Sequence, residues 1–334
     1  MVFLKKPVML VLLPAVLACV LCFHLISYSY TGATEAVLSR GAIKVPATMV
    51  WANPCQLRDY DQLILAANND PGAWAEGMNT ERRLWLVGQV ETMLLYGEQV
   101  VILAEQEGWV QVAAPGHRIA ADGRGYPGWI PAAHVATNEN YLANVDRLPA
   151  VAVKKPFAGV YKDIQLTKKL HEVSFMVTLP LLEEYQHSLA VSLPDGNVGY
   201  LSRDEVKRIA GIAFSPEEIV SAARQFLGLG YIWAGTGAYG FDCSGLTMRL
   251  YQSQGINIPR DADEQAWAGT AVQQQDLQPG DLVFYARLGE IYHVGMYIGD
   301  GLMIHAPNSG SAVQIDGITD GFYKNNIWGY RRYA

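Results

Sequence analysis

Short apolar segments interrupted by glycine and proline limit the middle of this chain to small antiparallel β-structure. Four such segments follow one another between residues 92 and 135: TMLLYG, QVVILAEQ, GWVQVAA and GWIPAAHV. Strands of this length separated by glycine turns are typical of a small barrel. A stretch with helical character, LRDYDQLILAANNDPGAWAEGM, precedes them. We therefore expect residues 34–148 to form one small β-barrel with a helical insertion.

The same rhythm returns more loosely over residues 149–210. The segments VAVKKPFAGVYKD, HEVSFMVTLP and HSLAVSLPDGNVGYLSRDEV alternate and break at proline or Asp-Gly. In addition, GYPGWIPAAHV and GNVGYLSRDEV share the pattern Gly-x-x-Gly-aromatic-aliphatic followed by a turn. This internal repeat predicts a second copy of the barrel, with chance recurrence of turn residues as the alternative.

Length and composition set the broad class of protein. A chain of 334 residues is too long for one typical domain, and with 50% hydrophobic and 17% charged residues it can build several cores. The formal net charge is −7 and no basic block stands out, so we expect no nucleic-acid partner. Nothing in the sequence demands an oligomer, and we expect a monomer.

Residues 1–33 have the pattern of a targeting segment. Lys5 and Lys6 precede a run from residue 7 to residue 26 in which only His24 can carry a charge. This pattern is typical of a signal peptide, and the run is long enough to remain as a membrane anchor. Lipid attachment at Cys19 and a buried helix are the alternatives. A signal peptide or an anchor would place the remaining chain outside the cytoplasm, either secreted, associated with the cell wall or anchored to the membrane.

Four cysteines are too few for a disulfide framework. Cys19 and Cys22 lie in the leader, so only Cys55 and Cys243 remain in the body of the chain. If Cys243 is catalytic it cannot be bridged to Cys55, which we then expect to be a small buried or neutral residue.

Residues 211–334 combine helices with consecutive strands. FSPEEIVSAARQFLGLG predicts a helix with Ser215 as its cap, Glu218 completing a capping box and Gly228 at its end. A glycine-rich turn and a helix over residues 244–254 follow, and GDLVFYAR, YHVGMYIG and LMIHAP then have the pattern of strands. Helices followed by an antiparallel sheet give an α+β fold.

Cys243 stands where the glycine-rich turn becomes a helix, in YGFDCSGLTMRL. At a helix N-terminus a thiol meets unpaired backbone N–H groups and the positive end of the helix dipole, so we expect its pKa to fall. The same N–H groups can donate to an oxyanion during acyl transfer. The position suits a nucleophile, although a lone cysteine is more commonly a buried apolar residue.

A cysteine nucleophile needs a base, and His293 and His305 are the histidines of this part of the chain. Alternation along the strand directs His293 away from the apolar face. We predict that His293 is the base and that His305 orients it and fixes its tautomer. A zinc site on Cys243, His293 and His305 is an alternative, but it lacks a close ligand pair such as C-x-x-C.

The turn between the two histidine strands decides whether the histidines meet. A two-residue turn at residues 300–301 would set His305 opposite Met296, on the wrong face. A three-residue loop at residues 299–301 would pair His305 with Gly295, on the face of the first histidine. We predict the three-residue loop.

Together these motifs resemble the NlpC-type cysteine peptidases of bacterial cell walls. The resemblance rests on FDCSGL, PRDADEQ, PGDLVFY, HVGMYIGDG and IHAP, all between residues 214 and 334. It implies a papain-like α+β domain, preceded by two barrels similar to bacterial SH3-like domains. The implied roles are nucleophile for Cys243, base for His293 and polar orienter for His305. No metal and no organic cofactor is implied.

Two SH3-like domains before such a domain resemble the γ-D-glutamyl-L-diamino-acid endopeptidases. Those enzymes cut peptidoglycan stem peptides between D-glutamate and the diamino acid, and members with this layout prefer fragments with a free N-terminal L-alanine. The resemblance implies four substrate-binding residues: Tyr126, Tyr231, Asp242 and Ser244. It also implies a first-barrel carboxylate facing the substrate amine, for which we favour Glu91 over Glu98. Ala262 departs from the pattern, because relatives often carry serine or threonine at that position.

Three other functions remain open at this point. A peptidase of this kind could act on intact, cross-linked peptidoglycan, unless the first barrel closes the cleft. The chain could instead be a non-catalytic wall-binding protein, against which the complete Cys243, His293 and His305 argue. An acyltransferase on the same fold would transfer the acyl group to an added amine in preference to water.

Overall fold

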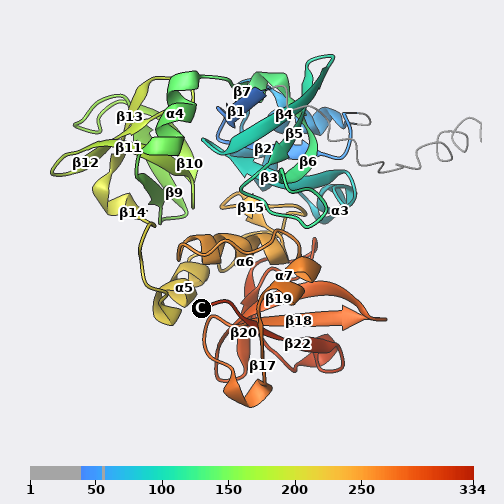
Figure 1. Ribbon diagram of the computed structural model, residues 1–334. Coiled ribbons are helices and arrows are strands. Elements are labelled where there is room, and N and C mark those ends of the chain that lie inside the picture. Colours follow the sequence, from blue (N-terminus) through green and yellow to red (C-terminus); the bar gives the residue numbers. More distant parts are fainter. Residues whose placement is uncertain (1–38, 55–56) are drawn as a thin grey trace, which may run out of the picture. The chain divides into compact units, whose positions relative to one another are not determined.

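The computed structural model describes residues 39–54 and 57–334, drawn as ribbons in Figure 1. The expected leader, with Cys19 and Cys22, lies outside the described residues, and so does Cys55. Within the described part of the chain, no helix is long and apolar enough to cross a membrane.

The first barrel is a seven-stranded antiparallel sheet in the order β3-β2-β6-β5-β4-β1-β7. Its strands are β1 (Ser39–Ile43), β2 (Ala47–Trp51), β3 (Val90–Leu95), β4 (Gln99–Gln106), β5 (Trp109–Ala114), β6 (Tyr126–Pro131) and β7 (Val135–Ala136). The four segments expected as strands fall on β3 to β7, as predicted. Their buried apolar side chains form a core that includes Val50, Leu94, Val112 and Ile130.

The helical insertion lies between β2 and β3 and is divided into short pieces. These are the 3₁₀ turn η1 (Asp59–Asp61), α1 (Gln62–Leu65), α2 (Pro71–Glu76) and α3 (Thr80–Trp85). Asp70 caps α2 by accepting from Ala73 N, and Asn79 caps α3 by accepting from Arg82 N. Each new cap starts a new helix, which is why the stretch does not form one long helix.

The second barrel repeats the first strand for strand. Its order is β10-β9-β13-β12-β11-β8-β14, which is the order of the first barrel with seven added to every strand number. The two glycine-aromatic segments both form a strand, a 3₁₀ turn (η2, Ala132–His134, or η3, Arg203–Glu205) and a short strand, so the predicted internal repeat is confirmed. The strands are β8 (Ala150–Val153), β9 (Phe157–Tyr161), β10 (Lys169–Ser174), β11 (Thr178–Glu184), β12 (Ser188–Ser192), β13 (Val198–Ser202) and β14 (Val206–Arg208).

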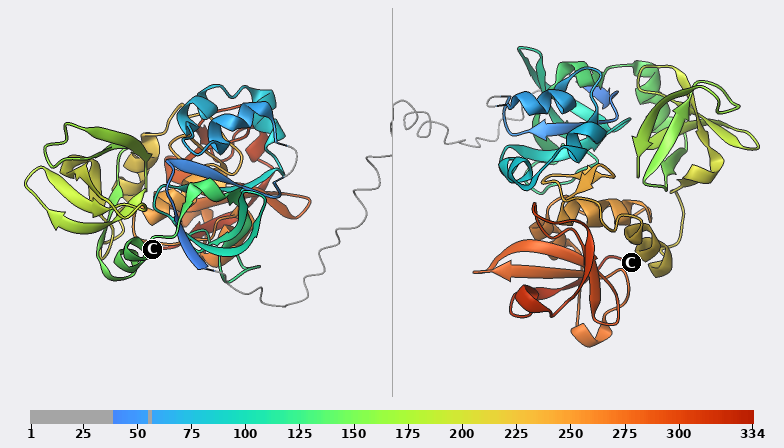
Figure 2. Two further views of the ribbon diagram at one scale, coloured as in Figure 1. Left: turned by 90° about the horizontal axis from the view of Figure 1, so that it is seen from above. Right: turned by 180° about the vertical axis from the view of Figure 1, so that it is seen from behind.

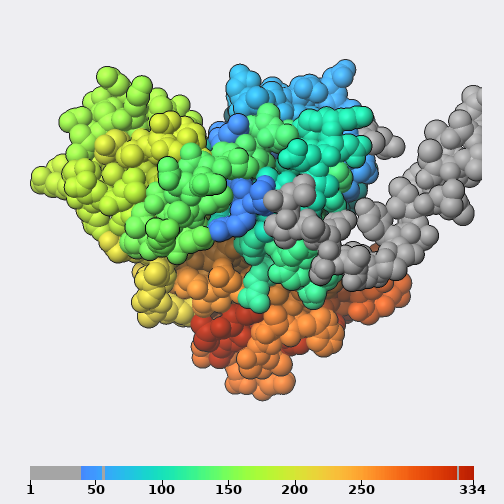
Figure 3. All heavy atoms as spheres, turned by 45° about the horizontal axis from the view of Figure 1, so that its top comes forward, coloured from blue at the N-terminus to red at the C-terminus, as the bar shows by residue number. Residues whose placement is uncertain are grey.

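Helix α4 (Glu139–Arg147) connects the barrels and contacts β1 of the first and β11 of the second. Asn138 caps it by accepting from Tyr141 N. The buried Tyr141 hydroxyl donates to the backbone oxygen of Gly97 at 2.9 Å, which ties the helix to the β3–β4 turn. Part of this connecting segment lies at the surface, in green, in Figure 3.

The C-terminal part is an α+β layer structure, as expected (Figures 1 and 2). Its sheet has the order β17-β22-β18-β19-β20-β21, and α6 and α7 both pack on β19. The helices are α5 (Pro216–Arg224), α6 (Cys243–Gln252) and α7 (Ala262–Ala268), with 3₁₀ turns η4 (Gln274–Asp276) and η5 (Gly321–Tyr323). The strands are β15 (Thr236–Gly237), β16 (Gly240–Phe241), β17 (Thr270–Val272), β18 (Leu282–Arg287), β19 (Glu290–Gly299), β20 (Leu302–His305), β21 (Gln314–Gly317) and β22 (Ile327–Arg332).

The β19–β20 hairpin has the predicted register but a different turn. Gly299 pairs with Leu302, so the turn has two residues, 300–301, both with positive φ (53° and 72°) as a type I′ turn requires. The predicted three-residue loop was therefore wrong. A bulge at residue 298 adds the residue that the short turn lacks, and Met296 pairs with Ile304. The histidine-bearing faces of the two strands consequently coincide.

Helix α6 approaches the preceding glycine turn so closely that Gly245 cannot carry a side chain. A Cβ there would overlap the backbone oxygen of Gly235 and lie 2.9 Å from Asp242 Oδ1. We predict that Gly245→Ala lowers the free energy of unfolding by about 1–3 kcal/mol, measured by urea unfolding. Gly123→Ala is the matched control, because nothing lies within 4 Å of a Cβ at that position. Equal stability of the two variants would contradict this account of the helix start.

Candidate active site

Cys243 is the first residue of α6, and Asp242 caps the helix. The Asp242 carboxylate accepts a hydrogen bond from the backbone N–H of Gly245 at 2.6 Å. The backbone N–H of Val294, the residue that follows His293 on β19, donates to the Cys243 sulfur. The helix cap thus holds the partly exposed thiol against the strand that carries His293.

The electrostatics of the thiol differ from the expectation. Burial and the Asp242 carboxylate raise the pKa of Cys243 to about 12, against the opposing effects of nearby backbone N–H groups and of the Arg260 guanidinium. The prediction of a lowered pKa was wrong because it considered the helix N-terminus without the carboxylate that caps it and without the surrounding side chains that exclude water. Both effects favour the neutral thiol over the thiolate.

His293 and His305 form a relay that ends at a carboxylate. His293 Nε2 lies 2.7 Å from His305 Nδ1, and His305 Nε2 lies 3.0 Å from Asp316 Oδ2. Because an ionised carboxylate can only accept, His305 donates from Nε2, and its Nδ1 accepts from the Nε2–H of His293. The lone pair of His293 is then on Nδ1, which makes that atom the proton acceptor of the relay.

Both imidazoles are buried, and burial favours their neutral forms. Burial, followed by the neighbouring His305, lowers the pKa of His293 well below its ordinary value. Burial also lowers the pKa of His305, against the opposing effect of Asp316. The Tyr323 ring packs on the relay, with its centroid 5.7 Å from that of His293 and 5.3 Å from that of His305.

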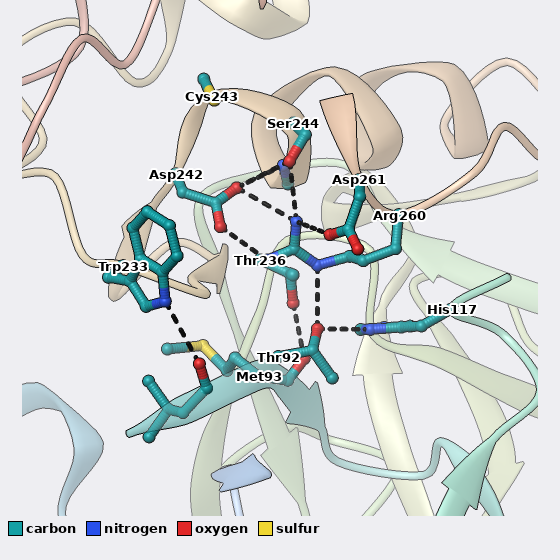
Figure 4. Close-up of polar contacts among 12 residues, drawn as sticks. Thr92, Met93, His117, Trp233, Thr236, Asp242, Cys243, Ser244, Arg260 and Asp261 are labelled. Atoms are coloured by element: carbon teal, nitrogen blue, oxygen red, sulfur yellow. Dashed lines mark hydrogen bonds and ion pairs between the residues drawn. The ribbon is translucent and has the colours of Figure 1, made fainter. Parts of the chain in front are cut away.

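Arg260 is buried and binds the cap of α6 (Figure 4). Its guanidinium donates to the two Asp242 carboxylate oxygens, at 2.6 and 3.2 Å, and to Ser244 Oγ at 2.9 Å. Its Nε donates to Thr92 Oγ1, on β3 of the first barrel, at 2.9 Å. The side chains of Asp242 and Ser244 therefore accept hydrogen bonds from Arg260. Their expected contact with the substrate stays a prediction.

Thr92 links Arg260 to a second buried arginine. Thr92 Oγ1 lies 2.7 Å from His117 Nδ1, and His117 Nε2 accepts from Arg249 of α6 at 3.1 Å. Arg249 also donates to Glu98 at 2.6 Å. Burial would raise the pKa of Glu98, but the Arg249 and His117 side chains hold it well below its ordinary value. The Glu98 carboxylate thus links the first barrel to α6 through Arg249.

Glu91 and Tyr126 of the first barrel lie close to Asp261. The Tyr126 hydroxyl donates to Asp261 Oδ2 at 2.9 Å. Burial, followed by the Asp261 carboxylate, raises the pKa of Glu91, and burial also raises the pKa of Asp261, with the Arg260 guanidinium opposing both shifts. Among the described residues Glu91 forms no ion pair, unlike Glu98. Glu91, Tyr126 and Asp261 form what we call the acidic cluster.

Tyr231 and Ala262 lie at two other points of the site. Burial, followed by the nearby Cys243, raises the pKa of Tyr231, so its phenol lies within electrostatic reach of the sulfur. Ala262 begins α7 directly after Asp261 and offers no hydroxyl. In the described part of the chain, no group of three or more His, Cys, Asp or Glu side chains is arranged to hold a metal ion.

Sequence reasoning missed three residues that contact this site. Arg260 and Asp261 lie in PRDADEQ, a motif that was used only for the family resemblance, so neither side chain was given a role. Asp316 lies on β21, whose pairing with β20 sets Gln314 opposite His305. The only sequence signal for Asp316 is the short segment VQIDG, which follows an irregular loop after His305.

A cysteine at the start of a helix, packed against a buried histidine relay on an antiparallel sheet, defines a cysteine peptidase of α+β fold. A family model described as the NlpC/P60 family matches residues 228–332, and one described as the YKFC SH3b2 domain matches residues 153–208. The chain belongs to the NlpC/P60 peptidase family, so the resemblance seen in the sequence and the enzyme class are confirmed.

Two relatives match nearly the whole chain. A gamma-D-glutamyl-L-lysine dipeptidyl-peptidase of Bacillus cereus is 37% identical over 318 residues, which are 92% of this chain and 95% of the relative. An enzyme of the same name from Bacillus subtilis is 33% identical over 288 residues, covering 85% and 95%. The crystal structure of an NlpC/P60 family protein from B. cereus superposes with a TM-score of 0.83 at 36% identity, covering 88% of this chain and 99% of that one.

The relay gives Asp316 the role of fixing the tautomer of His305. With asparagine at this position His305 can take the other tautomer, so the lone pair of His293 is no longer held on Nδ1. We predict that Asp316→Asn lowers kcat by about 10- to 100-fold with little change in KM. Asp300→Asn removes the same charge from the exposed β19–β20 turn and should leave kcat unchanged. Equal kcat for both variants would rule out the relay.

The raised pKa of Cys243 predicts how the free thiol reacts. Only the thiolate is alkylated, and its fraction rises about tenfold per pH unit below the pKa. We expect the iodoacetamide alkylation rate of Cys243 to rise continuously from pH 6 to pH 9, with Cys243→Ala as the control for reaction at other cysteines. A rate that is already constant across this pH range would instead indicate a preformed thiolate–imidazolium pair.

Proposed function

We propose that this enzyme hydrolyses the γ-D-glutamyl–L-diamino acid bond of peptidoglycan stem peptides that have a free N-terminal L-alanine. The observation that carries the proposal is the acidic cluster, which adjoins the cap of α6 through Arg260. The names of the two Bacillus relatives support the bond that is cut.

The acidic cluster has the electrostatics of a site for an ammonium group. Burial raises the pKa of both carboxylates, and the Asp261 charge raises that of Glu91 further, so a cation bound between them favours their ionised forms. The Tyr126 hydroxyl already orients one of them. A free N-terminal amine bound there is paired and hydrogen-bonded, so its loss of water is offset.

The proposed mechanism follows from the relay. His293 Nδ1 accepts the proton of the Cys243 thiol as the sulfur attacks the γ-carbonyl carbon of D-glutamate. Backbone N–H groups at the start of α6 donate to the oxyanion. The C–N bond then breaks, His293 returns its proton to the leaving nitrogen, and water, deprotonated by His293, cleaves the thioester. No step uses a metal or an organic cofactor.

We also propose that the enzyme works outside the cytoplasm as a monomer. The support for this location is Lys5 and Lys6 followed by the apolar run of residues 7–26. A monomer is proposed because nothing in the sequence demands an oligomer. An N-terminal sequence of the protein from its native host would distinguish a cleaved leader from a retained one.

The decisive experiment compares two peptides by mass spectrometry: L-Ala-γ-D-Glu-L-Lys with a free amine and the same peptide with that amine acetylated. We expect cleavage of the free peptide only, and none by Cys243→Ala. Glu91→Gln should lower kcat/KM for the free peptide about 10- to 100-fold, which corresponds to the loss of one charge-assisted contact. The exposed Glu105→Gln is the matched first-barrel control.

The other outcomes separate the alternatives. Equal cleavage of both peptides would discard the amine site and favour a hydrolase of intact peptidoglycan. Cleavage of neither peptide by folded protein, with transfer to an added amine from another donor, would favour an acyltransferase.

A further inference from the structure

A cavity of about 700 Å³ opens beside His293. Its lining residues all lie between residues 287 and 323. Tyr292, His293, Pro307, Asn308 and Tyr323 line it together with Arg287, Leu288 and Glu290 from the tip of the β18–β19 hairpin. The cavity thus belongs to the sheet, whereas the acidic cluster belongs to the first barrel and the start of α7.

The register of the hairpin places two opposite charges on the face that carries His293. Tyr285 pairs with His293, and two residues farther along β18 Arg287 pairs with Glu290, beyond a bulge in β19 at residue 292. Cross-strand partners share a face, and so do residues two apart on one strand. Two residues of strand span about 7 Å, which is the offset between the imidazole and the charged pair. Among the described residues, neither Arg287 nor Glu290 forms an ion pair.

The cavity lies where the leaving residue must be. In the proposed mechanism His293 protonates the nitrogen of the diamino acid, so that residue occupies the space that His293 lines. A straight side chain with a terminal amine extends about 6 Å from its α-carbon. Its end therefore reaches the Arg287–Glu290 pair when the α-nitrogen is at the imidazole.

We propose that Arg287 and Glu290 bind the end of the diamino acid side chain and select one whose distal carbon carries both an ammonium and a carboxylate. This inference rests on the proposed function. Glu290 accepts from the ammonium, and Arg287 donates to the carboxylate in the planar two-bond geometry that a guanidinium favours. A lysine side chain offers only the ammonium, so it satisfies Glu290 and leaves Arg287 without a partner from the substrate.

The test compares kcat/KM for L-Ala-γ-D-Glu-meso-diaminopimelate and L-Ala-γ-D-Glu-L-Lys. We expect the wild-type enzyme to prefer the first peptide about five- to tenfold, a modest ratio because both charges are exposed. Arg287→Gln should bring the first peptide to the level of the second without changing the second. Arg224→Gln, an exposed arginine on α5, is the matched control and should keep the full preference.

Two modified peptides make the result independent of how the variants fold. Amidation of the distal carboxylate should abolish the wild-type preference, whereas amidation of the α-carboxylate should preserve it. Equal wild-type rates for the two starting peptides, or a preference that survives in Arg287→Gln or follows the α-carboxylate, would overturn the assignment. Cleavage of neither starting peptide would instead overturn the proposed function, which separates the two failures.

Discussion

The buried ion pair between Arg260 and Asp242 is the contact on which the rest of the site depends. Removing two charges from water is costly unless every donor and acceptor is used, and here the guanidinium bonds Asp242, Ser244 and Thr92. Asp242 in turn caps the helix that begins with the cysteine. Since Thr92 lies on β3, the first barrel supplies one of the contacts that hold this helix in place. The first barrel is therefore part of the peptidase site.

The two barrels share one strand order, yet only the first contributes to the acidic cluster. In the repeated segment, Tyr126 of the first barrel corresponds to Asn197 of the second, which cannot make the same contact with Asp261. Both barrels form hydrogen bonds with the β15–β16 hairpin. The Met93 backbone oxygen of the first barrel accepts from Thr236 Oγ1, and Ser174 Oγ of the second barrel accepts from Ala238 N. A common scaffold therefore serves docking in both copies, while the proposed substrate contacts reside in side chains of one copy.

Local sequence patterns predicted the parts of the site that local geometry determines. The Ser215 cap, the position of Cys243 at a helix start and the shared face of the two histidines follow from motif and periodicity. The predicted turn length was wrong because a bulge in the strand can compensate for a shorter turn. Neither the bulge nor the shorter turn has a unique sequence signature. Asp316, and the choice between Glu91 and Glu98, depend on pairings between distant segments. The pKa of Cys243 depends on packing, which no pattern of residues encodes.

The neutral resting state of the site changes what the relay must do. The raised pKa of the thiol and the lowered pKa of the imidazole both oppose transfer of the proton from Cys243 to His293. The transfer creates an imidazolium in a buried place, which is unfavourable unless a negative group compensates it. Asp316 supplies that charge through His305, at hydrogen-bond distances of 3.0 and 2.7 Å. The carboxylate at the end of the relay thus stabilises the imidazolium that forms when the thiol gives up its proton.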